Sequence, residues 1–65
     1  MKVFYYRKLA KKRQKDIAEM LGITVQNYSL KENGKRSFKA NEMRKVRDYL
    51  NDELNENLTI DELFF

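Results

Sequence analysis

The sequence of 65 residues contains no proline and only two glycines, Gly22 and Gly34. Proline and glycine most strongly disfavour the interior of a helix, so the stretches around these two positions are free to be helical. The alternation of apolar and polar residues that is typical of half-buried strands is absent. The sequence therefore predicts an all-α fold, and its length suits one compact domain over residues 1–65.

The first segment shows the amphipathic spacing of a helix. Val3, Tyr6 and Ala10 fall on one stripe, which is expected to face the core. The opposite, solvent-facing side is expected to carry Arg7, Lys8, Lys11 and Lys12.

Helix ends are marked by residues with specific backbone preferences. Gly22 and Gly34 suit the left-handed conformation that follows many helices, and Thr24 is a good N-cap. Thr59 and Glu62 fit a capping box for a short last helix. Residues 51–57, rich in asparagine and acids, are predicted to form a loop. Five helices are expected, at about residues 2–11, 14–21, 25–32, 40–50 and 60–64.

The composition argues against several classes of function. There is no cysteine and no histidine, which removes the commonest general base and the commonest metal ligands. The acidic cluster of Asp52, Glu53 and Glu56 lacks the glycine and spacing of a calcium loop. We therefore expect no enzyme activity, metal, cofactor or small-molecule substrate.

No apolar run approaches the roughly 20 residues of a membrane span, and the first residues lack the apolar stretch of a signal peptide. A cytoplasmic location without membrane association is expected.

Charge is divided unevenly along the chain. Residues 1–39 carry eleven Lys/Arg against three acids, a net charge of +8, whereas residues 40–65 carry a net charge of −4. A basic half joined to an acidic half indicates a surface that faces a polyanion, although solvated helix faces would give the same division.

Residues 14–33 meet the requirements of two helices joined by a tight turn. Ala18 is small at the point where the two helix backbones approach, and Gly22 provides a relaxed backbone at the turn. The apolar residues expected to point inward are Ile17, Leu21, Ile23 and Tyr28. These independent features together predict a helix-turn-helix.

This segment resembles the helix-turn-helix of small phage and bacterial repressors of the Cro and lambda-repressor type, the XRE-like family. Glu32-Asn33-Gly34-Lys35-Arg36 is similar to the segment that follows the recognition helix in that family. Leu58-Thr59-Ile60-Asp61-Glu62-Leu63-Phe64 is similar to the family's closing turn. The resemblance covers nearly the whole chain and implies a compact five-helix, lambda-repressor-like DNA-binding domain.

The resemblance also implies roles for individual residues. Gln14 matches a residue that anchors on phosphate and supports a base-contacting side chain. Val25 and Gln26 match the base-reading start of the recognition helix, where valine can contact a thymine methyl and glutamine can pair with adenine. Leu30 matches a third, exposed, groove-facing position. With the phosphate-clamping segment that follows, the implied DNA-binding residues are Gln14, Lys15, Thr24, Val25, Gln26, Asn27, Leu30, Asn33, Lys35 and Arg36.

The sequence departs from the family pattern at two points. Lys11-Lys12-Arg13 precedes Gln14 in place of a glycine, an apolar residue and a threonine, so the second helix has no obvious N-cap. Lys31 occupies a position that is usually apolar, and we expect its stem to cover the core while its ammonium group stays in solvent.

Aromatic and sulfur-containing side chains divide into two groups. Core positions are expected for Tyr28, Phe38, Met43 and Phe64. Phe4 and Tyr5 belong either to the rim of the core or to a surface for a partner.

The implied function is sequence-specific binding of double-stranded operator DNA by a Cro-type repressor of a phage or mobile element, with residues 25–32 in the major groove. A homodimer is expected to form through the C-terminal apolar residues Leu54, Leu58, Leu63, Phe64 and Phe65. The alternative is a protein-interaction module, an antitoxin or antirepressor, on the same fold.

Overall fold

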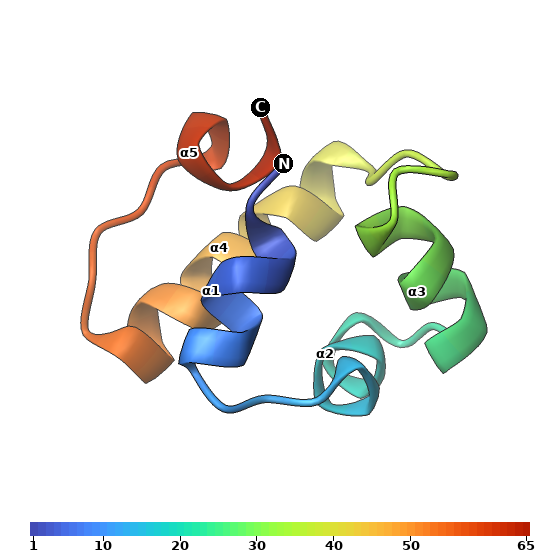
Figure 1. The fold of residues 1–65 in the computed structure, drawn as a ribbon, viewed down its shortest axis with the longest axis horizontal. Helices are drawn as coiled ribbons and strands as arrows, with labels where there is room; N and C mark the ends of the chain where they lie inside the picture. The colour runs from blue at the N-terminus through green and yellow to red at the C-terminus, as the bar shows by residue number, and fades with distance from the viewer.

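The computed structural model describes residues 1–65 and contains five helices. They are α1 (Val3–Leu9), α2 (Gln14–Leu21), α3 (Val25–Glu32), α4 (Ala40–Leu54) and α5 (Ile60–Phe64). Helices α1 and α5 pack on α4, and the α2–α3 pair lies beside them (Figure 1). The predicted all-α, five-helix fold is confirmed, and the limits of α2, α3 and α5 agree with those read from the sequence.

The two ends of the chain lie together (Figure 1). The backbone N–H of Lys2 donates a hydrogen bond to the carbonyl of Leu63 at 2.8 Å, which ties the start of α1 to α5. No helix is long and apolar enough to cross a membrane.

Local signals around the helix-turn-helix have the predicted effect. Gly22 ends α2 in the left-handed conformation with φ 71°. The Oγ1 of Thr24 then accepts a hydrogen bond from the backbone N–H of Asn27 at 3.0 Å and caps α3. Thr59 and Glu62 form the predicted reciprocal capping box at the start of α5.

Helix α4 is one turn longer than predicted and replaces part of the expected loop. Asn51 is a helical residue whose side chain bonds the backbone of Leu58 twice, accepting from its N–H at 2.8 Å and donating to its carbonyl at 3.1 Å. The helix ends at Asn55, which adopts the left-handed conformation with φ 54°. The asparagines that indicated a loop therefore end α4 and fasten the segment that follows it.

The core forms where all five helices meet. Tyr28, Phe38 and Phe64 are buried as predicted and contact one another edge to face, with ring centroids 5.9 and 4.9 Å apart. Met43 is partly buried against this cluster. The buried apolar residues are Val3, Ile17, Ala18, Tyr28, Phe38, Val46, Leu50, Leu58, Leu63 and Phe64.

This core corrects the expected dimer surface. Leu58, Leu63 and Phe64 are buried inside the domain, and Leu54 is half-buried against the core. Only Phe65 of that set is largely exposed, at 81%. The apolar residues of the C-terminal part serve mainly to attach α5 to α4, because a 65-residue domain needs them for its own core.

Candidate nucleic-acid interface

Helix α3 presents the start of its outer face to solvent. Thr24, Val25 and Gln26 are exposed, and Asn27 and Leu30 are half-buried. Ala18 of α2 is buried, and α2 and α3 pack on each other. Leu30 is less exposed than the sequence suggested.

A buried ionic cluster supports this face from behind. The Arg7 guanidinium donates to both carboxylate oxygens of Glu32 at 2.9 Å, and the side chains are only 7% and 1% exposed. Tyr28 donates its hydroxyl to Glu32 Oε2 at 2.6 Å. Arg7 also donates to the carbonyl of Lys12 at 2.8 Å, so all three nitrogens of its guanidinium group are hydrogen-bonded. The expectation that Arg7 faces solvent is wrong.

The cluster determines the protonation of its members. Burial acts to raise the pKa of Glu32, but hydrogen bonds from Arg7, Tyr28 and Gln14 outweigh it and lower that pKa. The hydrogen bond to Glu32 raises the pKa of Arg7. Burial and the adjacent carboxylate raise the pKa of Tyr28. The group is therefore an ion pair with a neutral phenol at neutral pH.

Gln14 connects this cluster to the surface. Its Nε2 donates to Glu32 Oε1 at 3.1 Å, from the first residue of α2 to the last residue of α3. A carboxylate only accepts hydrogen bonds, so the amide nitrogen must face Glu32, and the carbonyl oxygen of Gln14 is directed elsewhere. One N–H and the carbonyl of a half-buried side chain remain available at the amino end of α2.

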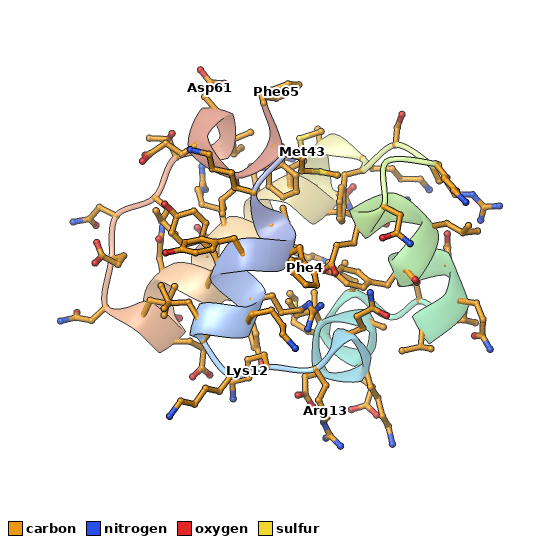
Figure 2. All side chains as sticks on the ribbon, in the orientation of Figure 1. Phe4, Lys12, Arg13, Met43, Asp61 and Phe65 are labelled. Carbon is orange, nitrogen blue, oxygen red and sulfur yellow. The ribbon has the colours of Figure 1, made fainter.

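The start of α2 is stabilised from inside the helix. The backbone N–H of Arg13 donates to Asp16 Oδ2 at 2.9 Å, and its guanidinium donates to Asp16 Oδ1 at 3.0 Å. These bonds lower the pKa of Asp16 to about 2. Arg13 itself points away from the domain (Figure 2). Asp16 therefore compensates for the missing N-cap side chain that the sequence indicated.

The basic segment after α3 is attached to α3 itself. The backbone N–H groups of Lys35 and Arg36 both donate to the carbonyl of Leu30, at 2.9 and 3.2 Å, and Gly34 makes this turn possible with φ 79°. Arg36 Nη1 then donates to Asn27 Oδ1 at 2.8 Å. Two exposed cations are thus held beside the outer face of α3.

The expectation that the ammonium group of Lys31 stays in solvent is wrong. It is buried, and its ammonium group contacts Glu42 Oε1 at 2.9 Å and the carbonyl of Ser37 at 3.0 Å. Burial acts to raise the pKa of Glu42, but the bonds from Lys31 and from the backbone N–H of Lys39 lower it. This ion pair joins the end of α3 to the start of α4, so the position carries a polar interaction where the family has an apolar residue.

The ten implied DNA-binding residues lie on the α2–α3 pair and the turn after it. Gln14, Asn27 and Arg36 make hydrogen bonds within the protein, whereas the side chains of Val25 and Gln26 are free. Sequence reasoning missed the supporting residues Arg7 and Glu32. Arg7 follows Val3 by four residues, so its helical stripe could have indicated burial.

Residues 3–56, which include four of the five helices, match the helix-turn-helix family of the Cro and lambda-repressor type. The chain belongs to this family. Membership of the helix-turn-helix family implies DNA binding and transcriptional regulation, and the family is typically non-enzymatic. No curated protein and no solved structure matches the chain.

Proposed function

We propose that this helix-turn-helix protein is a Cro-type repressor that binds one operator sequence, with α3 in the major groove of duplex DNA. The observation that carries the proposal is the exposed first turn of α3. Thr24, Val25 and Gln26 are accessible there, next to a basic turn that is fixed to α3 through Asn27 and Arg36.

Each part of this surface has a chemical counterpart on DNA. Gln26 can bond adenine bidentately at its N6 and N7 atoms, and Val25 can contact the methyl group of thymine. Lys35 and Arg36 suit phosphates, which position a protein on the duplex without reading sequence. Gln14 lies at the amino end of α2, where helix amides favour a phosphate oxygen.

The operator of such a repressor contains two half-sites. A single α3 reads only a few base pairs, so a homodimer that binds half-sites about 34 Å apart gains the specificity that one domain lacks. A phage or mobile element is the proposed source, because its small repressors share this architecture.

Selection of bound sequences from random duplex DNA tests the proposal. We expect one motif with twofold symmetry to be enriched. Binding to that motif should weaken by orders of magnitude between about 50 and 200 mM salt, because several phosphate contacts release counterions. Selection without any enriched motif would contradict sequence-specific regulation.

A further inference from the structure

Arg36 differs from the other paired arginines in its partner. Arg7, Arg13 and Arg47 each contact a carboxylate, at 2.9 or 3.0 Å. Arg36 instead donates from Nη1 to the amide oxygen of Asn27 at 2.8 Å. An amide carries no charge, so the bond orients the guanidinium group without neutralising it. The positive charge of Arg36 therefore remains available for an anion outside the domain.

Arg36 is held to α3 at two points. Its backbone N–H donates to the carbonyl of Leu30 at 3.2 Å, and its side chain reaches back to Asn27, in the first turn of α3. Helix α3 and the turn that follows it lie at one edge of the molecule (Figure 1). Ordering a long, exposed side chain costs affinity when it binds a partner. Asn27 orders Arg36 before any partner arrives, which reduces that cost.

Asn27 lies on a flank of α3. Tyr28 and Glu32 are buried and mark the inner side of the helix. Gln26 and Leu30, four residues apart, lie on the opposite side, and Asn27 is about 100° around the helix from Gln26. A helix with its side chains is about 10–12 Å across, and the major groove is about 12 Å wide. The flanks of a helix in this groove therefore face the phosphates on its two walls.

The hydrogen bond also restricts what Asn27 can recognise. Asparagine pairs with adenine by donating to N7 and accepting from the N6 amino group. The oxygen of Asn27 is engaged by Arg36, so this pairing would require breaking that bond. The pair offers two amide N–H groups of Asn27 and four further N–H groups of Arg36, all of them donors. Charged donors of this kind form their strongest hydrogen bonds with anionic oxygens such as those of phosphate.

We propose that Asn27 is a positioning residue that holds the charged guanidinium group of Arg36 against a phosphate on one wall of the major groove and reads no base itself. The proposal rests on the proposed function and deepens it, because it links α3 directly to the DNA backbone. Asn27 acts through Arg36, whereas its neighbour Gln26 reads the base. A phosphate contact of this kind fixes the position of α3 in the groove without adding sequence information.

The Asn27→Asp variant separates positioning from neutralisation. A carboxylate can accept the same bond from Arg36, and an acid in the first turn of a helix is favourable, so the melting temperature should not fall. The new negative charge cancels that of Arg36 and repels phosphate. Binding to the selected operator should weaken at least about tenfold, and the salt dependence should fall by about one counterion, as for Arg36→Ala. Unchanged DNA binding would overturn the proposal.

A double-variant cycle with Asn27→Ala tests whether Asn27 acts through Arg36. The change keeps the backbone N–H that bonds to Thr24, so the circular dichroism spectrum should be unchanged. Asn27→Ala should weaken DNA binding about two- to tenfold, the cost of ordering one long side chain. It should have no effect when Arg36 is already alanine. With Lys35→Ala as the matched control, the two effects should add. Equal effects of Asn27→Ala in the presence and absence of Arg36 would overturn the proposal.

The base preferences of the variants distinguish positioning from base reading. On operators with each base pair substituted, Asn27→Ala should weaken binding to all sequences by the same factor, as Arg36→Ala should. Gln26→Ala, which removes a neighbouring amide side chain, should instead remove discrimination at one base position. Loss of discrimination at any position in Asn27→Ala would make Asn27 a base reader and overturn the proposal.

Duplex DNA of mixed sequence separates this proposal from the proposed function. At low salt such DNA is bound essentially through its phosphates, so the cycle between Asn27 and Arg36 can be measured without an operator. Coupling on mixed-sequence DNA without any enriched motif would refute the proposed function and support the positioning role. An enriched motif with no coupling between Asn27 and Arg36 on either DNA would overturn the positioning role alone.

Discussion

Glu32 is the residue on which the candidate interface depends most. Its carboxylate accepts hydrogen bonds from Arg7, Tyr28 and Gln14, which belong to all three helices of the amino-terminal half. A buried ion pair is weak evidence for stability by itself, but removing one partner leaves a buried charge without compensation.

The Glu32→Gln variant should therefore be strongly destabilised. Breaking a buried pair costs about 3–5 kcal/mol, which is much of the stability of a domain this small. Urea unfolding measures the loss. Asp48→Asn, which breaks the exposed Arg47–Asp48 pair, is the control and should change the free energy of unfolding by under about 0.5 kcal/mol. Similar losses of unfolding free energy in both variants would show that the buried cluster contributes no more to stability than an exposed ion pair.

Acid should destabilise the domain through lowered carboxylate pKa values. The pKa values of Glu32 and Glu42 lie below the usual 4.5, and that of Asp16 is about 2 against a usual 3.8. The folded state therefore binds protons less readily than the unfolded chain. The stability that these groups provide is complete above about pH 5 and is lost as the pH falls toward 2.

Chemical denaturation at a series of pH values measures this dependence. The free energy of unfolding should be flat near neutrality and fall below about pH 5. A domain whose stability is constant from pH 6 to about pH 3 would contradict the assigned hydrogen bonds.

At the level of helices, the junction between α1 and α2 contains one of the two non-glycine residues with a positive φ. Lys11 has φ 59°, in the left-handed region that disfavours residues with a side chain. Lys11→Gly should relax this strain and stabilise the domain by up to about 1 kcal/mol. Thermal unfolding tests this, with Lys12→Gly as the control that should not stabilise. A lower melting temperature for Lys11→Gly would refute the prediction.

The helices also show which features the sequence can predict and which it cannot. The limits of α2 and α3 were predictable because Gly22 and Thr24 act within a few residues of themselves. The last turn of α4 was not predictable, because Asn51 forms a hydrogen bond with Leu58, seven residues away, and is part of the helix. The buried positions of Arg7 and Lys31 depend on partners 25 and 11 residues distant, which no local pattern specifies.

For the whole molecule, the fold and the candidate DNA surface were readable from sequence to different degrees. The helix-turn-helix follows from local signals and from the family resemblance. The internal bonds of Gln14 and Asn27 required the structure, because Glu32 and Arg36 meet them only after folding. The expected dimer surface failed for a related reason, since the demand of a small core for Leu58, Leu63 and Phe64 is visible only in three dimensions.

The central proposal is that Gln26 reads bases, whereas Lys35 binds phosphate. Gln26 is exposed at the start of α3, and Lys35 is exposed in the turn that follows α3. The most direct test compares Gln26→Ala and Lys35→Ala on the selected operator and on operators with each base pair substituted.

Gln26→Ala should remove discrimination at one symmetric base position at a cost of about 1–3 kcal/mol. Lys35→Ala should weaken binding to all sequences alike and reduce the salt dependence by about one counterion. Equal losses on every sequence for both variants would contradict the claim that α3 reads bases through Gln26.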